Sequence, residues 1–188
     1  MSDFLYIGAA SSKQEIEDHF KKVAERLLNG HVLWINSKPF RLLEIEFYLN
    51  SANHTDTFTH GDPQQSKRGE WYFHKLGKNY KSGTYKGLDI AFGQGDASRG
   101  GILLRAMIPL NPKDFEETRE MKEKKSVLKH QADPIDGPCN LVNRILEEGK
   151  VVKIDDLVVL KEFSHNCFIV AQEKKEAVSR KKKGDKKE

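Results

Sequence analysis

Two acidic residues stand at strand spacing in a segment that otherwise has the pattern of a β-strand. Along residues 40–48, Glu44, Glu46 and Tyr48 share one face. The alternate positions place three apolar residues on the other face, Leu43, Ile45 and Phe47. A carboxylate on a half-buried sheet face costs free energy unless a cation pairs with it or a reaction uses it. The spacing therefore predicts either an ion pair or a catalytic acid or base.

A single cation interrupts an otherwise apolar run at residues 102–108. This run predicts a core strand, and within it the guanidinium of Arg105 requires a carboxylate or phosphate partner. Glu44 and Glu46 are the candidates. Spacing alone favours a structural ion pair over a catalytic one, because buried charges are usually paired.

Other polar clusters give weaker signals. His54, His60 and His74 with Asp56 fit no compact ligand pattern, and the two cysteines form no CxxC pair. The glycine-rich turn at 93–101 lacks the following helix and the Lys-Ser/Thr of a phosphate-binding loop. We therefore expect no metal ion and no cofactor.

The elements that position these residues begin with an amphipathic helix. Ser12 and Glu15 have capping-box spacing, and Asn29-Gly30 supplies a stop after an apolar stripe. Segments 31–36 and 40–48 flank Ser37-Lys38-Pro39 and predict a hairpin. Residues 50–68 lose periodicity and form a long loop, which is typical of a functional or a disordered segment.

The second half of the chain predicts further strands and two helices. The expected strands are 88–92, 102–108, 151–160 and 167–171, and the expected helices are 112–128 and 138–149. Together these elements predict an α+β fold, with one domain over residues 1–172 whose curved, mainly antiparallel sheet is flanked by helices.

Charge is concentrated at one end of the chain. Of the 32 Lys and Arg and the 28 Asp and Glu, eight and four lie in residues 173–188, so 24 of each sign remain in residues 1–172. The basic segment 173–188 predicts a disordered tail, either a solvated terminus or a nuclear-localisation or nucleic-acid arm. No signal-like or membrane-spanning apolar run is present, which predicts an intracellular protein, nuclear or cytoplasmic, with no membrane partner.

Several motifs, in order from about residue 22 to 165, resemble the mammalian-type alkyladenine (3-methyladenine) DNA glycosylases. The matching segments are Glu44-Ile45-Glu46-Phe47-Tyr48-Leu49, Asp56-Thr57-Phe58-Thr59-His60, Arg68-Gly69 before Trp71-Tyr72-Phe73, Gln94-Gly95-Asp96, Leu103-Leu104-Arg105-Ala106 with Pro109-Leu110, and Gly137-Pro138 with Leu141. The resemblance implies a barrel similar to the C-terminal domain of formyltransferases.

The resemblance also implies base excision repair of double-stranded DNA by a monomer. A damaged or alkylated purine would be flipped out of the duplex and its N-glycosidic bond hydrolysed. Glu46 would be the general base and Arg105 would position the attacking water. Tyr48, His60 and Tyr80 would stack on the flipped base.

Two positions depart from the family pattern. Ser82 stands where the family has the wedge tyrosine that fills the vacated stack. Asp89 stands where the family has the asparagine that reads the flipped purine, and an ionised carboxylate only accepts hydrogen bonds. Two further functions therefore remain open: a catalytically inactive nucleic-acid or nucleoside binding module that retains the fold, and hydrolysis of a free nucleoside.

Overall fold

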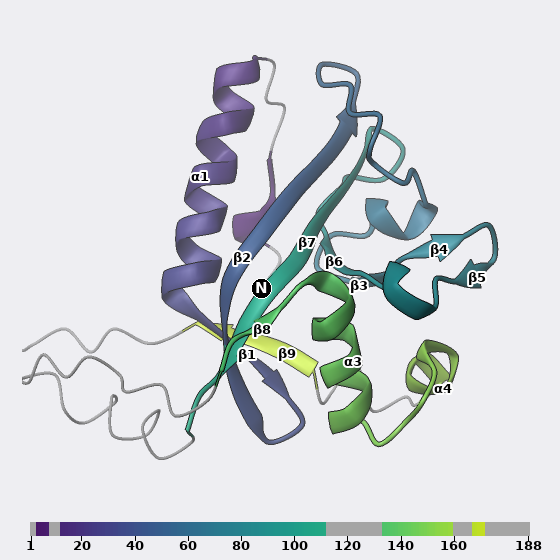
Figure 1. The fold of residues 1–188 in the computed structure, drawn as a ribbon. Helices are drawn as coiled ribbons and strands as arrows, with labels where there is room; N and C mark the ends of the chain where they lie inside the picture. The colour runs from purple at the N-terminus through teal and green to yellow at the C-terminus, as the bar shows by residue number, and fades with distance from the viewer. Residues whose placement is uncertain (1–2, 8–11, 112–132, 160–166, 172–188) are drawn as a thin grey trace, which may run out of the picture.

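A strongly curled antiparallel sheet forms the centre of the protein (Figure 1). The structure is a computed structural model that describes residues 3–7, 12–111, 133–159 and 167–171. The strands are β1 (His31–Ile35), β2 (Lys38–Ser51), β3 (Trp71–Phe73), β4 (Lys75–Leu76), β5 (Asn79–Tyr80), β6 (Leu88–Ala91), β7 (Ser98–Pro109), β8 (Ile135–Asp136) and β9 (Cys167–Ala171). The helices are α1 (Lys13–Gly30), α3 (Pro138–Glu148) and α4 (Ile154–Val159), with short 3₁₀ turns η1 (Asp3–Leu5), η2 (Pro63–Ser66) and η3 (Gly83–Tyr85).

The order of the strands places β2 and β7 in the middle of the sheet. The main path is β3-β6-β7-β2-β1-β9, with β8 paired to β7, while β4 and β5 form a separate two-stranded sheet. Neighbouring strands pair in antiparallel fashion. The predicted α+β fold with a curved antiparallel sheet flanked by helices is therefore confirmed.

Helix α1 begins at the predicted capping box. The Ser12 hydroxyl accepts from the Glu15 backbone N–H at 3.2 Å, and the Glu15 carboxylate accepts from the Ser12 backbone N–H at 3.1 Å. Its apolar stripe, with Ile16, Val23 and Leu27, is buried against the sheet. The helix passes directly into β1, which with β2 forms the predicted hairpin. In Figure 1, α1 runs alongside β2.

Helix α3 lies beside β7 and β8 (Figure 1) and confirms the expected helix near 138–149. The strand expected at 151–160 is wrong, because Ile154–Val159 forms α4. Ile154 and Leu157 are buried, and a separation of three suits a helix. Asp155 and Asp156 lie in the first turn, where the helix dipole favours negative charge.

Two expectations lie outside the described residues, namely the helix at 112–128 and the tail at 173–188. Within the described ranges, no helix has the length and apolarity needed to cross a membrane.

Candidate functional site

An irregularity in the pairing of β2 with β7 aims the charged side chains. The register between the two strands shifts between Leu42 and Glu44 and again between Glu44 and Ile45. Leu43 on β2 and Arg105 on β7 have no partner in this pairing. Bulges rotate side chains and often lie next to active sites. Before the irregularity the even-numbered residues of β2 face the core, and after it the odd-numbered residues do.

Because the bulge rotates the side chains of β2, one prediction from the alternation of apolar and polar residues is wrong. Leu43 was expected on the apolar face. It is instead 42% exposed, because it is the extra residue of the bulge. Ile45 and Phe47 pack against the core as expected. Glu44 and Glu46 therefore share the opposite face with Arg105.

Glu46 is the best-connected acid of this face. Its Oε1 accepts from Nη1 of Arg105 at 2.7 Å, and its Oε2 accepts from the Tyr48 hydroxyl at 2.6 Å. Glu44 lies 3.5 Å from Nε of Arg105 and is more exposed, with 52% of its side chain accessible against 35% for Glu46. Nε of Arg105 has no hydrogen-bond partner among the described residues, so the contact with Glu44 is charge attraction only. Arg105 thus fixes Glu46 more firmly than Glu44.

The Tyr48 hydroxyl remains a donor under ordinary conditions. Burial, followed by the hydrogen bond to Glu46, raises the pKa of Tyr48 to about 12. A protonated phenol at 2.6 Å holds one oxygen of the Glu46 carboxylate in place.

Tyr48 also lines a pocket of about 200 Å³. The other lining residues are Phe58, His60, Gln65, His74, Asp89 and Leu103. Three of the seven come from the long loop at 50–68, which therefore supplies one side of the pocket. The volume is below the roughly 300–1,000 Å³ of sites for drug-sized ligands and suits a single ring system.

His60 lies at the rim of the pocket between polar partners. Its Nδ1 is 3.1 Å from the Tyr72 hydroxyl, its Nε2 is 3.3 Å from Nζ of Lys81, and its ring meets that of His74 edge to face. Burial, followed by the charges of His74 and Lys81, lowers the pKa of His60. Because the Lys81 ammonium only donates, the neutral imidazole accepts at Nε2 and donates from Nδ1 to Tyr72.

The closed end of the pocket holds a second carboxylate. Asp89 has a side chain only 2% exposed, and its Oδ1 lies 2.7 Å from Nε2 of His74. Sequence reasoning placed Asp89 in the pocket but missed His74 as its partner and missed both Gln65 and Phe58. The signal available in advance was weak, because the register that pairs β3 with β6 is not visible in either strand alone.

Tyr80, expected to stack on the base, and Ser82, expected at the wedge position, are not part of the pocket lining. Tyr80 packs edge to face on Phe73, toward the core. Ser82 is exposed just before η3. Asp56, considered as a metal ligand, instead accepts from the backbone N–H groups of Leu49 and Phe58.

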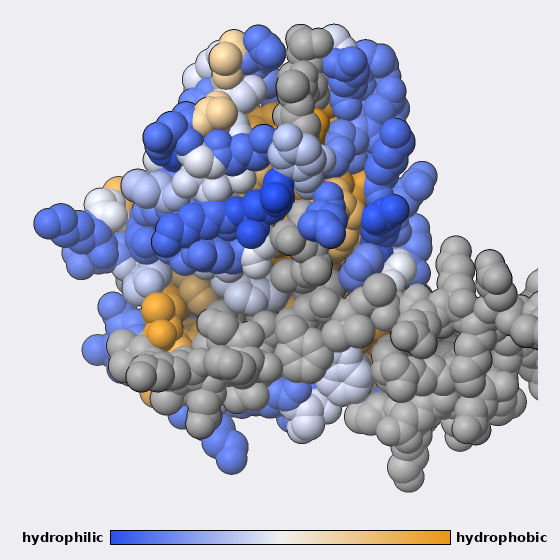
Figure 2. Space-filling view, turned by 180° about the vertical axis from the view of Figure 1, so that it is seen from behind, coloured by the Kyte–Doolittle hydropathy of each residue, from blue (hydrophilic) through white to orange (hydrophobic). Residues whose placement is uncertain are grey.

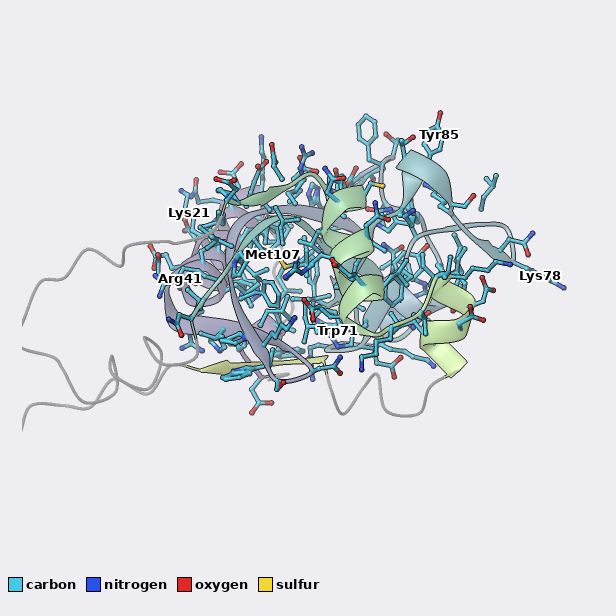
Figure 3. The ribbon with its side chains drawn as sticks, turned by 60° about the horizontal axis from the view of Figure 1, so that its bottom comes forward. Lys21, Arg41, Trp71, Lys78, Tyr85 and Met107 are labelled. Atoms are coloured by element: carbon cyan, nitrogen blue, oxygen red, sulfur yellow. The ribbon has the colours of Figure 1, made fainter. Side chains whose placement is uncertain are left out.

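A basic lobe adjoins the pocket. Residues 67–86 contain six Lys and Arg and one acid, Glu70. Lys78, Lys81 and Lys86 have no carboxylate within 4.0 Å among the described residues. Figure 3 shows Lys78 at the end of the β4–β5 hairpin and Tyr85 projecting from η3 on the same lobe. From behind, the hairpin projects as a hydrophilic arm (Figure 2). Cationic side chains are therefore gathered on one side of the pocket, although residues 1–172 balance in charge.

Comparison with known proteins finds a similar sequence, but that relative has no described function. No family model matches the chain. The chain is 37% identical over 148 residues to an uncharacterized protein of Acanthamoeba polyphaga mimivirus. The match covers 75% of this chain and 62% of the viral protein, so the chain spans about three fifths of the length of that relative.

Proposed function

We propose that this protein is a monofunctional DNA glycosylase that hydrolyses the N-glycosidic bond of alkylated or otherwise damaged purines. The observation that carries the proposal is the Glu46 carboxylate, held by Arg105 and Tyr48 beside a pocket sized for one base. The resemblance of the sequence to alkyladenine glycosylases supports the same reaction.

The chemistry requires a carboxylate that water can reach. Glu46 is about one-third exposed, so a water molecule can lie against it when a base fills the neighbouring pocket. Glu46 then accepts a proton from this water, whose oxygen bonds to the sugar carbon. The carbon–nitrogen bond breaks and its electron pair leaves with the base, while the carboxylate stabilises the positive charge that develops on the sugar.

The basic lobe supports a polyanionic substrate. Phosphate contacts by lysine and arginine supply most of the sequence-independent affinity for DNA. Lys78, Lys81 and Lys86 are available for such contacts, and Lys81 touches the pocket residue His60. The lobe and the pocket are therefore close enough for a flipped nucleotide to keep its flanking phosphates on cationic side chains.

Release of base from duplex oligonucleotides carrying one 7-methylguanine or one 3-methyladenine tests the proposal. With excess protein, we expect release above the spontaneous rate, and we expect Glu46→Gln to lower the single-turnover rate at least 100-fold, within the usual range for a lost general base. Glu44→Gln is the matched control, since it removes the neighbouring acid with the weaker contact to Arg105, and should change the rate by less than about threefold.

The alternative is a binding module without catalysis, and the exposed Ser82 in place of a wedge aromatic favours it. Duplex binding with no base release by the native protein would replace the glycosylase proposal with this one. Release of base from free 7-methylguanosine but not from the duplex would indicate nucleoside hydrolysis instead.

A further inference from the structure

The closed end of the pocket is built around the Asp89 carboxylate. His74 Nε2 lies 2.7 Å from Oδ1, and Gln65 Nε2 lies 3.4 Å from Oδ2. Asp89 and Gln65 are 2% and 1% exposed. Because a carboxylate only accepts, both neighbours turn an N–H toward it. The carboxylate is thus held from two sides in a fixed orientation.

Two glycines on neighbouring segments leave the space that this cluster occupies. A Cβ at Gly101 would come within 2.3 Å of Asp89 Oδ2 and 3.0 Å of Gln65 Nε2. A Cβ at Gly87 would come within 2.5 Å of Nδ1 of His74. Side chains at either position would displace the cluster, so its geometry depends on the absence of a side chain at both.

His74 positions the Asp89 carboxylate. Its Nε2 is engaged with Asp89, and its ring lies so close to Gly87 that a Cβ there would come within 2.5 Å of Nδ1. The polar atoms offered to a ligand at this end come from Asp89 and Gln65.

Gln65 adds a second acceptor. Its amide N–H faces the carboxylate, so Oε1 points away from Asp89, and this oxygen is buried with no hydrogen-bond partner among the described residues. A buried acceptor without a donor costs roughly 1–3 kcal/mol. A ligand that brings N–H groups to this end of the pocket would satisfy both Oε1 and the carboxylate.

Glu46 and Asp89 lie in one cross-strand row, on either side of Leu103. Both residues are register partners of Leu103, Glu46 on β2 and Asp89 on β6. Two strand spacings separate their backbones by about 10 Å. A base whose polar edge meets Asp89 therefore directs its sugar-bearing side toward Glu46.

We propose that Asp89, fixed by His74 and assisted by Gln65, is the base-reading group of the pocket and selects purines whose edge presents adjacent N–H donors. Guanine and 7-methylguanine present N1–H beside the 2-amino group, hypoxanthine presents N1–H alone, and adenine presents an acceptor at N1. A carboxylate beside an acceptor is repulsive, whereas two parallel N–H donors match it. The orientation of the sugar toward Glu46 rests on the proposed function. The preference among bases does not depend on it.

Nucleoside binding tests this proposal without bond cleavage. Guanosine, inosine and adenosine are titrated into the Glu46→Gln protein, with chemical-shift changes as the readout. We expect guanosine to bind at least 10-fold more tightly than adenosine, with inosine between them. Asp89→Asn, which replaces one acceptor oxygen by a donor, should reduce the guanosine preference to less than about threefold. Asp96→Asn, a fully exposed aspartate, is the matched control and should leave the preference unchanged.

Gln65→Met is the second variant, for the case in which Asp89→Asn does not fold. It keeps the approximate volume, and we expect it to weaken guanosine binding about 5-fold or more and to leave adenosine binding unchanged. Equal affinities for guanosine and adenosine in the parent protein, or an unchanged preference in a folded Asp89→Asn protein, would overturn the proposal. Base release from DNA without a preference for guanosine over adenosine would contradict only the base-reading role of Asp89. A preference for guanosine without base release would contradict only the glycosylase proposal.

Discussion

The two acids beside Leu103 differ in their access to water. Glu46 is about one-third exposed and is held by a permanent cation and a phenol, whereas Asp89 is 2% exposed and is held by an imidazole and an amide. An acid that water reaches can activate that water, while an acid sealed among donors can only accept hydrogen bonds from a ligand. Identical functional groups on β2 and β6, the two strands that flank β7, thus suit different tasks because of what surrounds them.

After substitution of Glu46 itself, the largest effect on this comparison is expected from removing the cation at the Glu46 end. Arg105→Gln removes the 2.7 Å contact and leaves Glu44 and Glu46 side by side without their shared partner. Hydrogen bonds to charged groups are worth about 1.5–3 kcal/mol, so we expect base release to slow by about 10–150-fold. Guanosine affinity at the Asp89 end should change by less than about threefold.

Arg99→Gln is the control for Arg105, because Arg99 lies on the same strand and pairs at 3.7 Å with an exposed aspartate. It should leave single-turnover release nearly unchanged. An equal loss in both variants would show that charge on β7, and not the contact with Glu46, determines the rate.

At the Asp89 end, Gly101→Ala is expected to act on folding. An added Cβ would come within 2.3 Å of the Asp89 carboxylate, and overpacking of this kind costs about 1–3 kcal/mol of unfolding free energy. Urea denaturation measures the change. Gly30→Ala, where a Cβ meets nothing within 4 Å, is the control and should shift the free energy by no more than about 0.5 kcal/mol. Similar stabilities for the two variants would argue against a tightly built closed end.

Tyr48→Phe sharpens the comparison by removing one neutral donor from Glu46. A neutral hydrogen bond contributes about 0.5–1.5 kcal/mol, so release should slow by about 2–10-fold. Because the pKa of Tyr48 is about 12, the phenol stays protonated through the alkaline range, and the effect of the substitution should be constant from pH 7 to 10. A substitution effect that disappears between pH 7 and 10 would contradict this donor role.

The smallest effect concerns His60 at the rim. Its folded-state pKa lies below the ordinary value of 6.5, so the unfolded chain takes up the proton first as pH falls. The contribution of neutral His60 to stability is therefore complete above about pH 6.5 and is lost as pH falls through the lower folded pKa. We expect a flatter stability curve below pH 6.5 for His60→Gln. Burial also lowers the pKa of His19, but His19 is present in both the native protein and the His60→Gln variant. Parallel curves of unfolding free energy against pH for these two proteins would therefore contradict a contribution from His60.

Sequence reasoning predicted the open end of the site better than the closed end. Strand alternation placed Glu46 beside Tyr48, and a lone charge in an apolar run identified Arg105 as a partner for Glu44 or Glu46. These signals are local, since each is contained in one strand. The bulge escaped detection because Leu42 and Leu43 are both apolar, so that composition does not show which of them turns outward.

The closed end depends on relations between distant segments. His74 meets Asp89 only through the pairing of β3 with β6, and Gln65 comes from a loop without periodicity. The glycines that leave room for them looked like turn geometry in the sequence. The prediction for residues 154–159 also failed. This run has the Val/Ile-rich composition of a strand, but Ile154 and Leu157 are buried at helical spacing.

The most direct test of the division between the two acids measures base release and guanosine affinity together in Glu46→Gln and Asp89→Asn. We predict that Glu46→Gln loses release at least 100-fold while guanosine affinity stays within about threefold of the native value. Asp89→Asn should instead lose the preference for guanosine over adenosine. Parallel loss of both quantities in both variants, or release that survives Glu46→Gln, would contradict the assignment of separate tasks to the two carboxylates.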